Sequence, residues 1–249
     1  MRKLVAALAC RNQSSRLYGK PLQSLDVDNG FKIIDNVVAC LSSFDEIVEV
    51  VLGISEGVEN KIFIEYAKSK NLNFIIGDEA DVLSRLVQCG GITDATDIFR
   101  VTSESPFVYH EMIDCAWKQH LKNQNDATFL DNIIDGCGFE IITLAALQES
   151  HAKGSSKHRS ELCTLFIREN KDLFKIEFIS PPASLSRKDI RLTVDYPEDL
   201  IVCRAVFEAF KHQAPKVELI EVVEFLDQNP DLKKLIAPFC EIGYSTMYL

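Results

Sequence analysis

The sequence lacks the cysteine patterns of common metal and redox sites, although it contains eight cysteines. No two of them form a CxxC pair, and no histidine stands at the spacing of a zinc finger. Zinc knuckles and redox dithiols need such close pairs, because the side chains must reach one ion or each other. The absence excludes both kinds of site. We expect most cysteines to be small, buried hydrophobic residues in a reducing cytoplasm.

Long runs of Lys and Arg are also lacking. Lys and Arg number 27 against 37 Asp and Glu, which gives a formal net charge of -10. A surface of net negative charge repels phosphate backbones, and no long run of Lys and Arg offsets that repulsion. The composition therefore excludes general nucleic-acid binding, and an anionic ligand must be bound by a few local cations.

Internal repeats, low-complexity segments and linkers are absent from the 249 residues. We therefore expect one domain over residues 1–249, with a C-terminal helical extension from about residue 216. Hydrophobic residues make up 47% of the chain, which suffices for a sizeable core. The apolar run at residues 4–10 is only as long as a strand, so it indicates a first strand and not a signal peptide. We expect a cytoplasmic protein with no membrane partner.

Short β-rich runs alternate with segments of helical period along the chain. This alternation predicts parallel strands joined by crossover helices, and hence a three-layer α/β/α sandwich with a mostly parallel sheet. It is less regular between residues 123 and 182. The predicted strands cover residues 4–10, 47–54, 73–77, 97–102, 126–130, 175–180 and 191–195. The predicted helices cover residues 31–44, 58–70, 79–89, 110–121, 160–170 and 197–210, with one or two more around Pro230.

The segment RNQSSRLYGKPL, residues 11–22, gathers cationic and hydroxyl side chains directly after the first predicted strand. In an open α/β sheet, ligands bind outside the carboxyl ends of the strands, and the loop after the first strand is a favoured phosphate site. Arg11, Arg16 and Lys20 have the chemistry to meet phosphate oxygens, and Ser14 adds a hydroxyl donor. The segment is not a Walker A loop, because it lacks the upstream glycine and the Ser or Thr after Lys20. A solvated basic turn is the alternative interpretation.

The same segment resembles the R-x-x-S-x-R-L-x-G-K-x-L signature of cytidylyltransferases that make CMP-activated acidic sugars, the acylneuraminate type included. In detail it is most similar to the spore-coat polysaccharide biosynthesis branch of that superfamily. Further blocks resemble the family in the same order along the chain, over roughly residues 4–230. They are EIVEVVLGISE (46–56), GDEADVLSRL (77–86), FRVTSESPFV (99–108), ELCTLFIREN (161–170) and IRLTVDYPEDL (190–200).

This resemblance implies a nucleotide-diphospho-sugar transferase-like, Rossmann-related fold and a CTP-dependent enzyme. Such an enzyme would transfer CMP to a nonulosonic or octulosonic acid and release pyrophosphate, for cell-surface polysaccharide. Two alternatives stay open. One is a cytidylyltransferase for a phosphate- or phosphonate-bearing small molecule, and the other is a family member that binds nucleotide without turnover. Whether the protein is a homodimer also stays open.

The resemblance also implies roles for particular residues. Lys20, Arg11 and Arg16 would hold the triphosphate and neutralise charge in the transition state. Further contacts to the nucleotide would come from Ser14, Ser15, Gly53, Ser55 and Arg85. The acceptor would be met by Glu140, His158 and Arg159. Mg²⁺ would be bound by two acids near the ends of predicted strands, Glu104 and Asp195.

Each of these roles has a structural alternative. Glu104 would then be a solvated loop acid, and Asp195 the N-cap of the helix that starts at YPED. Arg85 would be a surface arginine of a helix, and Arg100 a strand arginine paired with an acid. His158 and Arg159 would form the start of a solvated helix.

Four positions depart from the family pattern. Gln13 stands where the phosphate loop usually has Gly, and Tyr18 stands where Pro is common. Glu104 replaces the usual Asp but remains a hard oxygen donor. In DGCGFEI, residues 135–141, Gly138 replaces an acid of the D-G-x-D-x-E pattern, while Glu140 is retained. Gln13 and Gly138 are the features that keep the non-catalytic alternative open.

Overall fold

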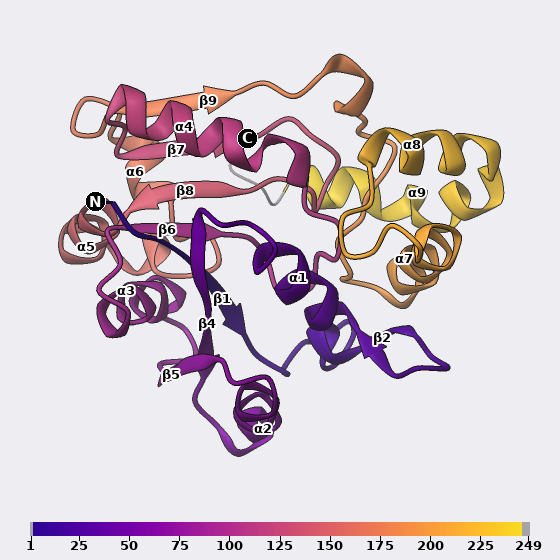
Figure 1. The fold of residues 1–249 in the computed structure, drawn as a ribbon, viewed down its shortest axis with the longest axis horizontal. Helices are drawn as coiled ribbons and strands as arrows, with labels where there is room; N and C mark the ends of the chain where they lie inside the picture. The colour runs from indigo at the N-terminus through magenta and orange to yellow at the C-terminus, as the bar shows by residue number, and fades with distance from the viewer. Residues whose placement is uncertain (1, 246–249) are drawn as a thin grey trace.

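The computed structural model describes residues 2–245, and a seven-stranded sheet forms the centre of this part of the chain (Figure 1). Across the sheet the strands run in the order β5-β4-β1-β6-β8-β7-β9. Neighbours are parallel except where β8 pairs with β6 and β7. The strands are β1 (Leu4–Cys10), β4 (Ile47–Ser55), β5 (Asn73–Gly77), β6 (Asp97–Arg100), β7 (Ala127–Leu130), β8 (Glu140–Thr143) and β9 (Ile176–Ile179). A separate hairpin pairs β2 (Ser24–Asp26) with β3 (Phe31–Lys32).

Helices cover both faces of the sheet, so the predicted three-layer α/β/α sandwich is confirmed. Alternate residues of β1 enter different cores: Ala6 and Leu8 belong to one, and Val5 and Ala7 to the other. All four are fully buried, as expected for a parallel strand covered on both faces. One core is covered by α3 (Val82–Ile92), α5 (Leu144–Lys153) and α6 (Leu165–Glu169). The other is covered by α1 (Ile33–Leu41), α2 (Lys61–Ser69), α4 (Ile113–Asn123), α7 (Pro197–Phe210), α8 (Leu219–Gln228) and α9 (Pro230–Ser245).

The sequence prediction was wrong at residues 191–195, which form no strand. Their backbone makes a single bridge, from Arg191 to Asp135, and then hydrogen-bonds to loops. The amide of Leu192 donates to Asp135 O (2.7 Å), and that of Val194 donates to Glu104 O (3.1 Å). Because these bonds go to two loops and not to a neighbouring strand, the segment extends no ladder, although it is extended and apolar.

Sequence patterns also missed β8 and α5, both inside the irregular stretch 123–182. The connection from β7 to β8 holds no crossover helix, so β8 returns antiparallel and inserts between β6 and β7. The helix predicted over 160–170 is shorter, since α6 begins only at Leu165.

The C-terminal helices α8 and α9 lie beside α7 at one end of the sheet (Figure 1). A network of exposed ion pairs ties them to the segment that precedes residue 190. Arg187 contacts Asp227 (2.7 Å), and Lys233 contacts Asp189 (2.7 Å). The tail after residue 216 therefore packs onto the sandwich next to residues 191–199.

Two further findings concern the cysteines and the length of the helices. Seven of the eight cysteines are buried and Cys115 is exposed, as expected for residues that act as small hydrophobes. Within residues 2–245, no helix combines the length and the apolar character needed to cross a membrane.

Candidate functional site

The loop after β1 is held in a fixed shape by its own backbone and by a neighbouring turn. Gly19 adopts a left-handed conformation (φ 62°), and its amide donates to Asn12 O (2.9 Å), which closes the loop. The amide of Asn12 donates to the side chain of Asn60 (2.8 Å), and the Asn12 side chain binds the carbonyl of Glu59. The cationic segment predicted to bind phosphate is thus a built loop at the carboxyl edge of the sheet.

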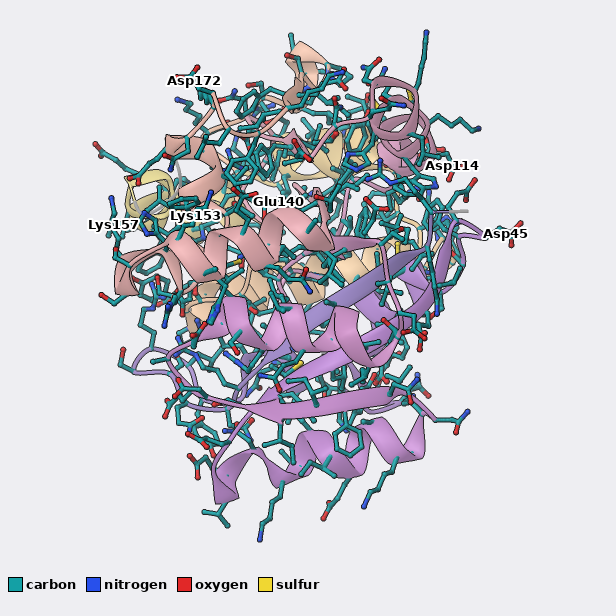
Figure 2. All side chains as sticks on the ribbon, turned by 90° about the vertical axis from the view of Figure 1, so that its left-hand side faces the viewer. Asp45, Asp114, Glu140, Lys153, Lys157 and Asp172 are labelled. Carbon is teal, nitrogen blue, oxygen red and sulfur yellow. The ribbon has the colours of Figure 1, made fainter. Side chains whose placement is uncertain are left out.

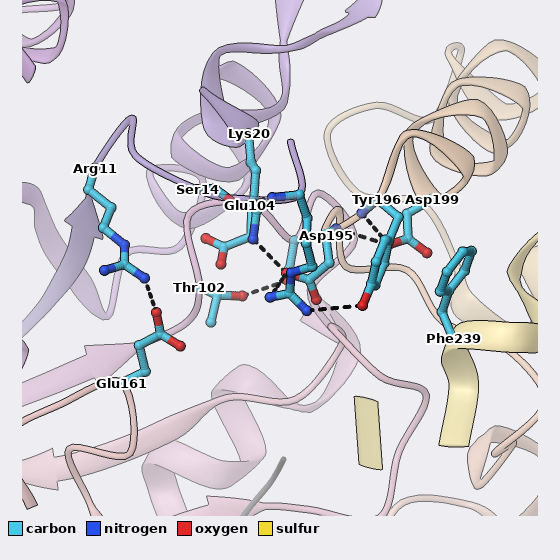
Figure 3. A network of polar contacts seen from close by, with 12 residues as sticks. Arg11, Ser14, Lys20, Thr102, Glu104, Glu161, Asp195, Tyr196, Asp199 and Phe239 are labelled. Carbon is cyan, nitrogen blue, oxygen red and sulfur yellow. Dashed lines mark hydrogen bonds and ion pairs between the residues drawn. The ribbon is translucent and has the colours of Figure 1, made fainter. Parts of the chain in front are cut away.

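The Asp195 carboxylate joins this loop to the segment that leads into α7 (Figure 3). Its Oδ1 contacts Lys20 Nζ (2.6 Å) and Arg16 Nη2 (3.1 Å), and its Oδ2 contacts Arg191 Nη2 (2.7 Å). Burial works to raise the pKa of Asp195, but the hydrogen bond from Lys20 and the three positive charges hold it below its ordinary value. The carboxylate is therefore ionised, and it holds Lys20 and Arg16 of the loop at the first cavity.

Asp195 is not the N-cap of α7, so that structural alternative is wrong. The N-cap residue is Tyr196. Asp199 supplies the capping carboxylate, since its Oδ2 accepts from the amides of Asp195 and Tyr196 (both 2.9 Å). The side chain of Asp195 is left to face the phosphate loop.

Glu104 follows β6 and lies in the same cleft as Asp195. In the described part of the chain its carboxylate accepts a hydrogen bond from Ser103 Oγ (3.2 Å). Burial raises the pKa of Glu104, an effect that the charge of Lys20 opposes and that of Asp195 reinforces. The bond from Val194 N to Glu104 O draws the two acid-bearing segments together. The structure thus places side by side two acids that are far apart in the sequence.

Two cavities share a wall and form one cleft. The first, of about 220 Å³, is lined by the loop from Arg11 to Arg16, by Lys20 and by the start of α3. Ser14 and Ser15 both lie on it. The second, of about 710 Å³, extends toward β8 and α9. Arg11, Arg16, Glu104 and Asp195 border both cavities, and Arg11 reaches across the cleft to pair with Glu161.

Arg85 is buried beneath the first cavity, so the surface-arginine alternative is wrong. Only 1% of it is exposed, and its Nη1 donates to Gly53 O (2.9 Å) and Cys10 O (3.3 Å). A Cβ at Gly77 would lie 2.9 Å from Arg85 Cγ, so this glycine leaves room for the arginine. Gly53 and Ser55 are themselves buried in β4 and do not line either described cavity. Their predicted contact with the nucleotide stays a prediction.

Glu140, at the start of β8, lines the second cavity and is buried, whereas Asp45 and Asp172 project from the edge of the molecule (Figure 2). It contacts Arg100 (2.6 Å), Arg168 (2.9 Å) and Thr164 (2.7 Å). Although burial works to raise its pKa, the two arginines hold the pKa of Glu140 below its ordinary value. Arg100 is therefore paired with an acid, as the structural alternative held.

His158 and Arg159 line neither described cavity, and their predicted contact with the acceptor stays a prediction. His158 is buried; its Nδ1 accepts from Ser155 N (2.8 Å), and its Nε2 contacts Glu169 (2.8 Å). Arg159 donates to the carbonyl of His151 (3.2 Å). His158 thus binds α6, whereas Arg159 lies against the start of α3: its Nη1 is 3.8 Å from Asp81 Oδ2, and its carbonyl accepts from Leu83 N (3.1 Å).

Sequence reasoning missed Arg191, which lies among three carboxylates. It is 1% exposed and contacts Asp195 (2.7 Å), Asp199 (3.0 Å) and Asp135 (3.6 Å). An arginine inside an apolar run is a usable signal, because a buried guanidinium needs acidic partners. Asp135 borders the second cavity and was missed as well.

Two of the departures from the family pattern fit the local packing. Gln13 holds the loop, since its amide group contacts the side chains of Glu59 and Asn60. At Gly138, a Cβ would lie 2.6 Å from the carbonyl oxygen of Leu130. The backbone here has no room for the acid that the pattern expects, so neither departure by itself indicates loss of activity.

Comparisons with known proteins agree with this geometry. A family model described as cytidylyltransferase matches residues 5–234. The chain is 29% identical over 234 residues to the uncharacterized protein MJ1063 of Methanocaldococcus jannaschii, covering 94% of each chain. It is 25% identical over 233 residues to the spore coat polysaccharide biosynthesis protein SpsF of Bacillus subtilis, covering 93% of this chain and 97% of that one.

Solved structures share the fold. A cytidylyltransferase from Leptospira borgpetersenii superposes with a TM-score of 0.83 at 20% identity, covering 93% of this chain and 97% of the other. A CMP:2-keto-3-deoxy-manno-octonic acid synthetase complexed with CTP superposes with a TM-score of 0.62 at 14% identity, covering 83% and 99%.

The packing around Gly138 generates a first prediction. Gly138→Asp should lower the free energy of unfolding by about 1–3 kcal/mol, because its Cβ overlaps the Leu130 carbonyl. Gly138→Ala adds the same Cβ without the charge and should lower it by a similar amount. Urea denaturation of both variants measures the effect. Native stability in Gly138→Asp would show that the backbone accommodates an acid here.

Asp135 generates a prediction on pH. Burial raises its pKa to about 6, with Arg191 opposing and Asp195 and Asp199 reinforcing the shift. Between about pH 4 and 6 the folded state then binds more protons than the unfolded state, so stability falls as the pH rises. The fall amounts to up to about 3 kcal/mol.

Asp135→Asn should remove this part of the pH dependence. We expect a flatter profile of unfolding free energy between pH 4 and 6.5 than in the native protein, measured by urea denaturation at each pH. Asp94→Asn, at an exposed loop, provides the background profile. Parallel profiles for Asp135→Asn and the native protein would contradict the assignment.

Proposed function

The chain belongs to the cytidylyltransferase family, and on that premise we propose that it transfers CMP from CTP to an acidic sugar of nonulosonic or octulosonic type. The reaction takes place in the cytoplasm and releases pyrophosphate. The CMP-activated sugar is then used to make cell-surface polysaccharide. Membership in the family makes the protein a nucleotidyltransferase; the base, the acceptor and the compartment are the proposed part. The observation that carries the proposal is the cleft in which Lys20 and Arg16 converge beside Glu104 and Asp195.

Lys20 and Arg16 are the groups proposed to hold the triphosphate. In the described structure both contact Asp195 Oδ1, so they are already gathered at one point of the first cavity. Both side chains carry further N–H donors besides those directed at Asp195, and a triphosphate would accept hydrogen bonds from them. Ser14 and Ser15 supply hydroxyl donors on the same wall, and Arg11 lies at the border with the second cavity. This preorganisation favours charge developing on the α-phosphate and on pyrophosphate.

Glu104 and Asp195 are the residues proposed to hold Mg²⁺. Carboxylates that face a phosphate loop are the donor set this ion prefers, and the Glu104 carboxylate has a hydroxyl partner and no cation at hydrogen-bond distance among residues 2–245. Asp195 lies beside Glu104 in the same cleft and would supply the second carboxylate. When bound, Mg²⁺ would neutralise phosphate charge and lower the pKa of the acceptor hydroxyl.

The second cavity is the proposed acceptor site. Arg100, Arg168 and Arg191 border it together with Asp131 and Glu140, and acids outnumber arginines along its wall. Such a mixture suits a sugar with one carboxylate and many hydroxyl groups. A phosphate- or phosphonate-bearing acceptor would call for an excess of cations, so this alternative is disfavoured. The names of SpsF and of the octonic acid synthetase that shares the fold point in the same direction.

The proposal is tested by pyrophosphate release from CTP, UTP, ATP and GTP, each with a panel of acidic sugars, with Mg²⁺ or with a chelator. We expect release with CTP and an acidic sugar that exceeds release with ATP or GTP and stops when the metal is removed. A polar pocket that fits the edges of cytosine leaves groups unpaired with a purine. Equal rates with ATP and CTP would refute the choice of base, and turnover only with phosphorylated acceptors would favour the alternative substrate class.

A further prediction concerns Lys20. Lys20→Ala removes a charge-assisted contact of about 1.5–3 kcal/mol, which corresponds to about a 10- to 150-fold loss in kcat/KM with CTP. Stability should change little, because Asp195 keeps Arg16 and Arg191 as partners. Lys118→Ala, on the exposed side of α4, is the matched control and should leave turnover unchanged. A stability loss with normal kcat/KM would make Lys20 structural.

A further inference from the structure

Arg191 lies behind Asp195, on the side away from the phosphate loop. Its Nη2 contacts Asp195 Oδ2 (2.7 Å), while the other oxygen of that carboxylate faces Lys20 and Arg16. Its Nε lies 3.0 Å from Asp199 Oδ1, and Asp199 caps α7. Because a guanidinium is planar and rigid, binding in these directions fixes the orientation of the Asp195 carboxylate.

The C-terminal helix α9 holds Arg191 from behind. Arg191 Nη1 donates to the carbonyl of Phe239 (2.8 Å), a residue of α9. The helix packs so closely that a Cβ on Gly243 would lie 2.8 Å from Arg191 Nη1 and 2.6 Å from Asp135 Oδ2. The ring of Phe239 stacks on Tyr196 with 4.0 Å between ring centroids (Figure 3).

Tyr196 extends the same contact toward the phosphate loop. The guanidinium of Arg16 lies over its ring, 5.1 Å from the centroid. Two routes therefore lead from α9 to the cations of the loop, one through Arg191 and Asp195 and the other through Tyr196. The contacts through Arg191 and Asp195 are the stronger, because they are charge-assisted hydrogen bonds of a buried guanidinium.

We propose that Arg191 is a positioning residue: held by α9, it fixes Asp195 so that this carboxylate keeps Lys20 and Arg16 aimed into the first cavity. The inference rests on the proposed function in that the cavity is taken to bind a triphosphate. It adds that α9 takes part in nucleotide binding without touching the nucleotide. Lys in place of Arg191 keeps the charge but cannot span Asp195 and the Phe239 carbonyl together.

The test measures binding of two probes, inorganic tripolyphosphate and CTP, by titration calorimetry without Mg²⁺. Arg191→Lys should weaken tripolyphosphate binding by about tenfold or more, the scale of one charge-assisted contact. Gly243→Ala, which pushes α9 away from Arg191 and leaves the arginine in place, should weaken it several-fold. Gly91→Ala, in α3 with no atom within 4 Å of the new Cβ, is the matched control and should have no effect. If Arg191→Lys fails to fold, the affinity of Gly243→Ala for tripolyphosphate still tests the proposal.

A double-mutant cycle separates positioning from general destabilisation. If Arg191 acts through Asp195, Arg191→Lys should cost little further affinity once Asp195→Asn has been introduced. Equal losses in both backgrounds, or native affinity in both Arg191→Lys and Gly243→Ala, would overturn the proposal. Tripolyphosphate that binds no more weakly than CTP in the native protein, with the cycle still coupled, would refute the choice of CTP and leave the role of Arg191 standing.

Discussion

The buried contact between Arg191 and Asp195 is the interaction on which the geometry of the cleft depends. An arginine that is almost fully buried needs acidic partners, and a carboxylate beside it needs cations. Asp195 meets this requirement on both sides, with Arg191 behind it and Lys20 and Arg16 in front. Removing Asp195 would take this shared partner from all three cations at once. The arrangement therefore ties the phosphate loop, the start of α7 and α9 into one unit.

The sheet supplies the platform for this unit. β1, β4 and β6 end at the same edge because they are parallel neighbours, so the loops that follow β1 and β6 emerge next to each other. Arg85 closes the floor beneath them by binding the last carbonyl of β1, that of Cys10, and the carbonyl of Gly53 in β4. The antiparallel strand β8 then widens the edge and carries Glu140 to the second cavity. Nucleotide and acceptor sides are thus built from different parts of one sheet.

The C-terminal helices belong to the site and are not an appendage. Ile242 and Gly243 of α9 border the second cavity, and Phe239 touches both Arg191 and Tyr196. The departures at Gln13 and Gly138 fit the same view, since each is accommodated by contacts of this chain: the first by Glu59 and Asn60, the second by the Leu130 carbonyl. A site whose unusual residues are packed in this way is consistent with an active nucleotidyltransferase that has its own acceptor preference.

The sequence by itself determined the mostly parallel sandwich, the place of the phosphate loop and the loop cations that line the first cavity, because hydrophobic period and local motifs record these directly. It also indicated that Glu104 and Asp195 follow segments that end at one edge. Only the tertiary structure decided that residues 191–195 form no strand, that β8 runs antiparallel, and that His158 and Arg159 contact α6 and the start of α3. Those outcomes depend on partners distant in the chain. The role of Arg191 is of the same kind: its local sequence is an apolar run, and its function is set by three carboxylates and a helix carbonyl that only folding brings to it.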